Sequence, residues 1–265
     1  MISLIQSLRE AQGNPKAIIL AGAPGAGKGY ILRGLDLGGL KTMNVDDIYV
    51  PLLKKANVSL DLKNATPEER SEQAKQMAAA NKQFKGEMEQ IIAGKESFIL
   101  DGTAASYNTT AKLKNELDEA GYDVFMLYVY TDLERSLSQN QDRYIKSGGK
   151  DRSLAPAIVM RTWKSVTDNL PKYEELFGNN FVAVANTLDD RMQDIDKIIQ
   201  KYLKPFTPQG TKPKTPAQQK KSDERKAKDK EEIQAMLDDD FIYDVIEYTM
   251  SKEEAQMRLK QFLSK

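Results

Sequence analysis

The stretch Ala17–Ala21, AIILA, runs directly into residues 22–30, GAPGAGKGY. Residues 17–21 are all apolar, with no alternation between apolar and polar side chains, which predicts a strand buried on both faces of a sheet. The loop after it matches G-x-x-x-x-G-K from Gly22 to Lys28, and the pattern of Gly27–Leu35 predicts a helix. A strand, a loop of this pattern and a helix in that order predict a phosphate-binding loop, in which backbone N–H groups and a lysine surround phosphate oxygens.

We expect this loop to hold a nucleoside triphosphate, with Lys28 reaching the β- and γ-phosphates. The residues assigned to the cradle are Gly22, Ala23, Pro24, Gly25, Ala26, Gly27, Lys28, Gly29 and Tyr30. Gly29 and Tyr30 follow the lysine where most such loops have Ser or Thr, which is a ligand of Mg²⁺. Magnesium is therefore expected to depend on carboxylates and water. The sequence has no Asn-Lys-x-Asp motif for reading guanine, so ATP is the expected nucleotide.

Short apolar runs alternate with longer helical patterns along the chain, which predicts an α/β fold with a parallel sheet between layers of helices. The order of elements is that of a P-loop NTPase with a three-layer fold and a five-stranded sheet. The expected strands are Ala17–Ala21, Thr42–Val45, Ser97–Asp101, Val124–Tyr130 and Phe181–Ala185. The expected helices are Gly27–Leu35, Pro67–Ala93, Thr109–Glu119, Asp132–Tyr144, Ala155–Phe177 and Asp189–Tyr202.

The composition changes after Leu203, which predicts three parts. We expect residues 1–203 to form the main P-loop domain, and residues 204–230 to form a linker rich in proline, lysine and other charged residues. Residues 231–265 have the pattern of a helical hairpin, including a capping box from Ser251 to Glu254. This C-terminal helical extension is too short for us to expect independent folding, so it should dock on the main domain, on a sister chain or on another protein.

The composition excludes several classes of function. With 39 basic and 39 acidic residues the net charge is zero, which makes nucleic acid an improbable partner. The chain has neither Cys nor His, which excludes thiolate nucleophiles, Ser-His-Asp chemistry and zinc sites built from those residues. Its longest apolar runs fall far short of a bilayer span, and its first residues lack the pattern of a signal peptide. We therefore expect a cytoplasmic protein without a membrane partner.

Acidic residues follow two of the expected strands, at the edge of the sheet where open α/β folds bind ligands. Asp46 and Asp47 follow the second strand, Asp101 ends the third, and Thr103 comes two residues later. Asp47 is the first choice for a base that takes a proton from an acceptor hydroxyl, and Asp46 is the second. Asp46 also stands as a substrate or magnesium ligand, although a helix cap with acidic residues in its first turn would explain both carboxylates. Asp101 would hold magnesium through water or, with Thr103, contact the acceptor; a turn at the end of the strand is an equally good explanation.

A basic loop with glycines, residues 143–152, lies between two expected helices. Its charge density predicts a lid. Arg143 and Arg152 would neutralise the charge on the phosphoryl group during transfer, although each arginine could equally lie on a solvated surface.

Taken together, these stretches resemble the zeta-toxin-like P-loop kinases, a family related to adenylate and polynucleotide kinases that is often seen in bacterial and phage genomes. The resemblance covers about residues 16–186 and rests on GAPGAGKG, NVDDIY, FILDGTAASYNTTAKLKNELDEAGYDVFMLYVY, the two arginines and NLPKYEELFGNNFVAV. It implies that Lys28 binds phosphate, that Asp47 is the base, and that Arg143 and Arg152 clamp the transferring phosphate. Asp101-Gly102-Thr103 stands where the family has Glu-Gly-Thr, which contacts the acceptor.

The leading hypothesis is an ATP- and Mg²⁺-dependent kinase that transfers the γ-phosphate to a hydroxyl of a small molecule, nucleotide or nucleotide sugar. The alternative is an ATP-binding switch or assembly protein that engages a partner, or a second copy, through its C-terminal helices. The loop's missing Ser/Thr and the long charged linker favour this alternative somewhat.

Overall fold

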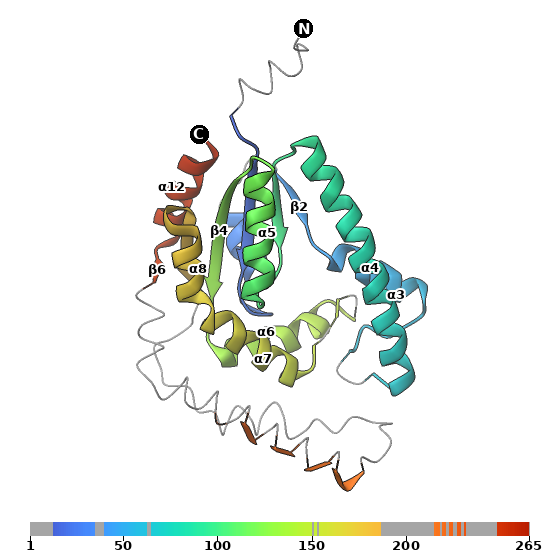
Figure 1. The fold of residues 1–265 in the computed structure, drawn as a ribbon. Helices are drawn as coiled ribbons and strands as arrows, with labels where there is room; N and C mark the ends of the chain where they lie inside the picture. The colour runs from blue at the N-terminus through green and yellow to red at the C-terminus, as the bar shows by residue number, and fades with distance from the viewer. Residues whose placement is uncertain are drawn as a thin grey trace.

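A computed structural model describes residues 13–34, 40–62, 65–149, 151–152, 154–186, 215–217, 219–220, 223–224, 227–228, 231 and 248–264. The fold is α/β, with a parallel sheet of strand order β2-β3-β1-β4-β5-β6 (Figure 1). The strands are β1 Lys16–Ala21, β2 Lys41–Met43, β3 Phe98–Asp101, β4 Asp123–Tyr130, β5 Phe181–Ala185 and β6 Thr249–Met250. The five expected strands are confirmed, and β6 is a sixth that was not expected, because two residues are too short for a periodic pattern.

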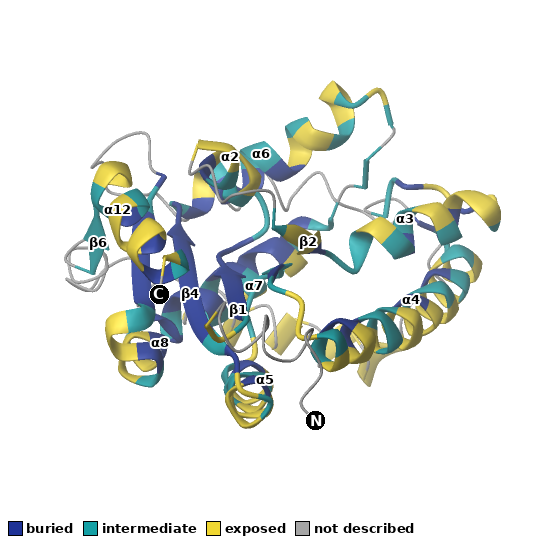
Figure 2. Cartoon of the chain, turned by 90° about the horizontal axis from the view of Figure 1, so that it is seen from above, coloured by how far each residue is buried: buried dark blue, intermediate teal, exposed yellow. Residues whose placement is uncertain are grey.

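The central strands are buried on both faces, as the unbroken apolar runs predicted (Figure 2). Successive side chains of a strand point to opposite faces, so Ile18 and Leu20 join one core while Ala17 and Ile19 join the other. The first core is covered by α2 Lys28–Gly34, α6 Leu133–Lys146, α7 Pro156–Asp168 and α12 Lys252–Leu263. The second is covered by α4 Pro67–Gly94, α5 Tyr107–Glu119, α8 Leu170–Phe177 and the end of α7.

Two helices differ from the sequence expectation. The expected helix Ala155–Phe177 is divided at Asn169 into α7 and α8, because Pro171 in the first turn of α8 has no N–H with which to continue the hydrogen-bond ladder. An additional helix, α3 Asp46–Lys55, follows β2. It packs against α4 around Tyr49 and Leu53 and forms a small core apart from the sheet.

The C-terminal segment joins the main sheet. Ser251 caps α12 by accepting a hydrogen bond from the Glu254 N–H, as the sequence indicated. The apolar face of α12 enters the first core, where the ring of Phe262 lies 5.0 Å from that of Phe125. The described part of this extension is therefore docked on its own chain.

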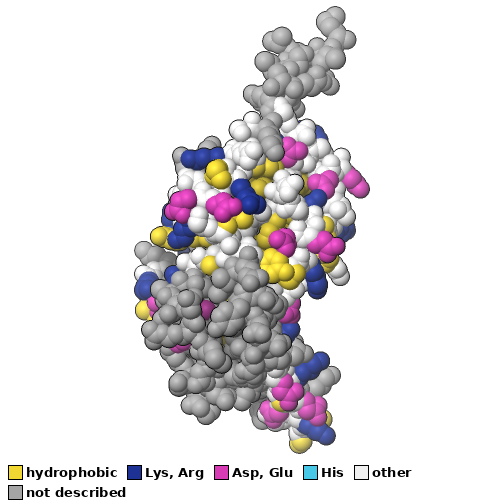
Figure 3. Space-filling view, turned by 90° about the vertical axis from the view of Figure 1, so that its left-hand side faces the viewer, with side chains coloured by type: hydrophobic (Ala, Val, Ile, Leu, Met, Phe, Trp, Pro, Cys, Tyr) yellow, Lys and Arg dark blue, Asp and Glu magenta, His cyan; other side chains and the backbone are white. Residues whose placement is uncertain are grey.

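Some expectations concern residues outside the described part. The expected helix Asp189–Tyr202 and the first helix of the C-terminal hairpin lie there. Those residues of 215–231 that are described are exposed, and all but the first are helical. On the side of the molecule drawn in Figure 3, basic and acidic side chains are interspersed. Among the described residues, no helix has the length and apolar character to cross a membrane.

Candidate active site

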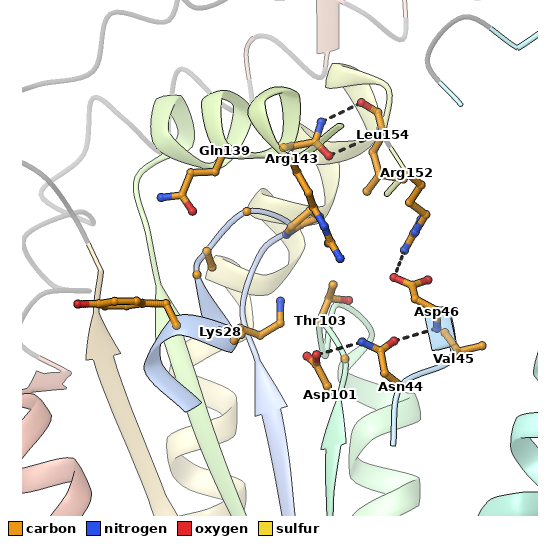
Figure 4. Close-up of a pocket in the computed structure, with 18 of the residues that line it drawn as sticks. Lys28, Asn44, Val45, Asp46, Asp101, Thr103, Gln139, Arg143, Arg152 and Leu154 are labelled. Carbon is orange, nitrogen blue, oxygen red and sulfur yellow. Dashed lines mark hydrogen bonds and ion pairs between the residues drawn. The ribbon is translucent and has the colours of Figure 1, made fainter. Parts of the chain in front are cut away.

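A cavity of about 600 Å³ opens at the carboxyl ends of the strands β1, β2 and β3 (Figure 4). The glycine-rich loop after β1 lies on one side of it, and the segments that follow β2 and β3 lie on another. Helix α6 and the segment that follows it, with Arg143 and Arg152, complete the wall. Of the residues assigned to the phosphate cradle, the cavity is lined by Pro24, Gly25, Ala26, Gly27, Lys28, Gly29 and Tyr30.

The glycines are required by the path of the loop. Gly25 has φ +78°, and a Cβ there would lie 2.4 Å from the Ser136 carbonyl oxygen. Gly27 has φ +79°, and a Cβ there would lie 2.3 Å from the side-chain nitrogen of Asn186. Both positions combine a left-handed backbone with close neighbours, so only glycine fits.

The loop is held to the strands around it. The amide nitrogen of Asn186, at the end of β5, donates to the Ala26 carbonyl at 2.8 Å. The Ser136 hydroxyl of α6 donates to the Pro24 carbonyl at 2.6 Å, and the Gly22 N–H donates to the Thr103 carbonyl at 3.1 Å. Contacts from both sides of β1 therefore fix the loop in one conformation before any ligand binds.

Lys28 lies at the centre of the cavity (Figure 4). Its ammonium donates to the carbonyls of Gly22 at 2.9 Å and Ala23 at 3.2 Å. Burial lowers the pKa of Lys28; Arg143 lowers it further, while Asp101 and Asp46 act in the opposite direction. An anionic phosphate in this place would restore the charged form that burial disfavours.

The structure separates the two neighbouring carboxylates. Asp46 lines the cavity, whereas Asp47 is exposed and is not among the residues that line it. Both begin α3, where adjacent positions are about 100° apart around the helix axis, so only one of them faces the cavity. Of the two residues that the sequence offered as a base, the structure therefore places the second choice, Asp46, at the cavity and the first choice, Asp47, outside it.

Asp46 is joined to the segment that follows α6. Its Oδ2 lies 2.6 Å from a terminal nitrogen of Arg152, and the two side chains are 17% and 19% exposed. Its other oxygen, Oδ1, is buried and has no hydrogen-bond partner within the described part of the chain; the same holds for Arg152 Nε. Asp46 therefore lines the cavity with one carboxylate oxygen paired to Arg152 and the other buried without a partner.

Asp101 and Thr103 also line the cavity, as expected. The pKa of Asp101 is raised, chiefly by burial, while Lys28 and a hydrogen bond from Asn44 counteract the shift. Asn44 links the two acidic positions, because its amide donates to Asp101 at 3.0 Å and its oxygen accepts from the Asp46 N–H at 2.9 Å.

The two arginines of the basic segment, Arg143 and Arg152, both line the cavity. Arg143 points from α6 towards Lys28 and Thr103 (Figure 4) and forms an ion pair with Asp151. Arg152 makes the pair with Asp46, and its guanidinium carbon lies 6.0 Å from the centre of the Tyr49 ring. The segment that carries them is anchored by Asn140, which exchanges two hydrogen bonds with the backbone of Leu154.

Sequence reasoning missed several residues of the site. Asn44 lies between the end of β2 and the acidic pair. Since the carboxyl ends of neighbouring parallel strands meet at one edge of the sheet, this position indicated that its side chain would lie near the loop after β3. Asn186 occupies the corresponding place after β5. The cavity is further lined by Val45 and Gly102, which belong to stretches quoted above without a role of their own, and by Arg33, Gln139, Asn140 and Leu154, which carry no motif.

The sequence model of the zeta toxin family matches residues 3–199, well over half of the chain. The chain belongs to the zeta toxin family. Membership and the phosphate loop make it a P-loop phosphotransferase, whose acceptor they leave open. No curated protein matches this zeta toxin homologue significantly.

Solved structures share its fold. A chain of the AvrRxo1-ORF1:AvrRxo1-ORF2 complex with sulphate ions is 15% identical at a TM-score of 0.51, covering 94% of this chain and 85% of that chain. The same complex with ATP gives 16% identity and a TM-score of 0.50, covering 100% and 84%. A chain of the PezAT toxin–antitoxin system of Streptococcus pneumoniae gives 16% identity and a TM-score of 0.46, covering 89% and 93%. At identities this low, the two structures with TM-scores of 0.51 and 0.50 establish a common fold and nothing further.

Proposed function

We propose that this protein transfers the γ-phosphate of ATP to a hydroxyl group of a small molecule, a nucleotide or a nucleotide sugar. One observation carries the proposal: a single cavity is lined by the phosphate loop with Lys28 and, across from it, by the carboxylate residue Asp46, one oxygen of which has no partner in the described chain. ATP is further supported by the complex of similar fold that was crystallised with it.

Asp46 is the residue that we assign as the base. The hydroxyl proton passes to Asp46 as the acceptor oxygen forms a bond to the γ-phosphorus, and the bond to the β-phosphate oxygen breaks to release ADP. For this step Arg152 must loosen its hold on Asp46, since a paired carboxylate is a weaker base. The phosphate oxygens offer Arg152 the alternative partner, with Arg143 beside it.

The carboxylates also fit a magnesium ion bound to the nucleotide, because Mg²⁺ prefers hard oxygen ligands and uses one or two carboxylates together with phosphates and water. Asp101 is the better candidate for that ion, since Asp46 serves as the base. When bound, the ion would neutralise charge on the β- and γ-phosphates. Gly29 supplies no hydroxyl, so the protein's share of the coordination rests on the segments after β2 and β3.

The docking of α12 bears on the alternative function. A partner protein recognised through the apolar face of this helix would have to displace Ala255, Leu259 and Phe262 from the core of their own domain. That requirement disfavours an assembly protein that uses α12 as its free arm. A protein partner on another surface, as in the toxin–antitoxin system named above, remains compatible with the proposal.

The test is transfer of label from [γ-³²P]ATP, with Mg²⁺, to the low-molecular-mass fraction of a cell extract. A kinase produces a new labelled species that is absent with the Lys28→Ala protein. If the native protein binds ATP but labels nothing and releases no ADP, the kinase assignment is wrong and a nucleotide-binding switch replaces it.

A further inference from the structure

Tyr30 is an aromatic side chain left open at the edge of the cavity. It is 61% exposed, and it is one of the cavity-lining residues. It comes second after the loop lysine, close to the position where most loops of this class place a small hydroxyl residue. Ligand cavities are commonly lined by aromatic side chains, so an exposed ring at this cavity offers a surface on which part of a ligand can pack.

The ring faces the side of the sheet away from the acidic residues. Asp46 follows β2 and Asp101 ends β3, which lie on one side of β1 in the strand order. Lys252 follows β6, at the opposite edge of the sheet, and its ammonium lies 4.9 Å from the centre of the Tyr30 ring. The cavity therefore has an acidic end at β2 and β3 and an aromatic end directed towards β6.

This polarity orients a bound nucleotide. If Asp46 receives the acceptor, the γ-phosphate must lie at the acidic end, and the nucleoside must leave the phosphate loop in the other direction. We propose that Tyr30 is the platform on which the base of the bound nucleotide stacks, with Lys252 holding the ring in place. This inference rests on the proposed function, because that function sets the direction of the phosphate chain.

The chemistry of the pair suits this role. A flat ring has two faces, and an ammonium over one of them leaves the other for a planar base. Stacking of a base on an aromatic side chain does not depend on which base it is, because every base has a π-face. Lys252 lies beyond residues 3–199, so the C-terminal segment supplies a residue of the nucleotide site that the part matched by the family model does not contain.

The experiment compares ATP with inorganic tripolyphosphate, which has the phosphate chain and no base. Affinities of the full-length protein for both are measured by calorimetry, for the native chain and for Tyr30→Ala, Tyr30→Phe and Lys252→Gln. We expect Tyr30→Ala to weaken ATP binding by roughly tenfold or more while tripolyphosphate binding stays within about twofold. Tyr30→Phe, which keeps the ring, should match the native protein, and Lys252→Gln should weaken ATP binding by about two- to fivefold.

Four results would overturn the inference. Equal losses for ATP and tripolyphosphate in Tyr30→Ala would show that the substitution disturbs the loop and not a base subsite. Unchanged ATP affinity in that variant would show that the ring contributes nothing. If the native protein binds tripolyphosphate as tightly as ATP, its phosphate loop works but it has no base subsite. If the native protein binds neither ligand, the proposed function is wrong as well.

Discussion

Replacing Asp46 by Asn tests the central assignment of the site. The substitution keeps the shape of the side chain and removes its ability to take a proton. It removes no hydrogen bond of the phosphate loop, since Asp46 belongs to α3 and pairs with Arg152, and Asp46 is the smallest of the named influences on the pKa of Lys28. We therefore expect catalysis to fall while ATP affinity stays within about threefold of the native value, because uniform binding by the loop is retained.

The magnitude has a catalytic part and a structural part. Loss of a general base costs about 10²- to 10⁴-fold in rate. The ion pair with Arg152 spans 2.6 Å between side chains less than one fifth exposed, so it is a charge-assisted hydrogen bond worth about 1.5–3 kcal/mol. Asn still accepts a hydrogen bond from Arg152, so we expect the free energy of unfolding to fall by about 1.5 kcal/mol, the lower end of this range. For a domain of this size that corresponds to a fall in Tm of about 3–6 °C.

The assay measures phosphate transfer from labelled ATP to the extract fraction, with ADP release and thermal unfolding in parallel. The matched control is Asp47→Asn, the same change at the next residue, which is exposed and outside the cavity. It should leave the rate within about twofold and stability within about 0.5 kcal/mol. A loss of transfer in Asp47→Asn together with a normal rate in Asp46→Asn would refute the reasoning and restore the expectation from sequence.

The remaining predictions concern the loop and the C-terminal helix. Burial lowers the pKa of Lys28, and only the charged form of the lysine attracts phosphate. ATP affinity should therefore fall as the pH rises from neutral towards about 10, below the pH at which an ordinary lysine titrates. Calorimetry across this pH range measures the affinity, and an affinity that does not change with pH contradicts the prediction. The weak residual affinity of Lys28→Ala should show no such dependence. Gly25→Ala should abolish ATP binding and lower the Tm, since its Cβ would lie 2.4 Å from a backbone oxygen, whereas Gly86→Ala, which meets no atom within 4 Å, should raise the Tm slightly. Phe262→Ala should cost about 3–5 kcal/mol in urea unfolding, while Met257→Ala, on the same helix and 63% exposed, should cost less than about 0.5 kcal/mol; equal effects would mean that α12 is not part of the core.

The phosphate loop and the strand before it could be predicted from sequence because their determinants are local. An unbroken apolar run requires burial on both faces, and glycines at fixed spacing permit the left-handed backbone that lets the loop turn back on itself. The resemblance to zeta toxins rested on the same local stretches. These features belong to a few consecutive residues, so no knowledge of distant neighbours was needed.

The choice between Asp46 and Asp47 depended on tertiary structure. Both are acidic, both follow β2, and one helical step of about 100° decides which of them faces the cavity. That rotation is set by the packing of Tyr49 and Leu53 against α4, far from any motif. The pair of Asp46 with Arg152 joins positions 106 residues apart, and sequence order carries no information about such a meeting.

The C-terminal segment shows the same division. Its sequence alone determined a capped amphipathic helix, because capping and periodicity are properties of neighbouring residues. That β6 adds a strand to the sheet, that α12 enters the core and that Lys252 meets Tyr30 were decided only when the chain folded back on itself. The apolar face of a helix predicts that this face will be buried, but only the shape of the assembled sheet determines where the helix packs.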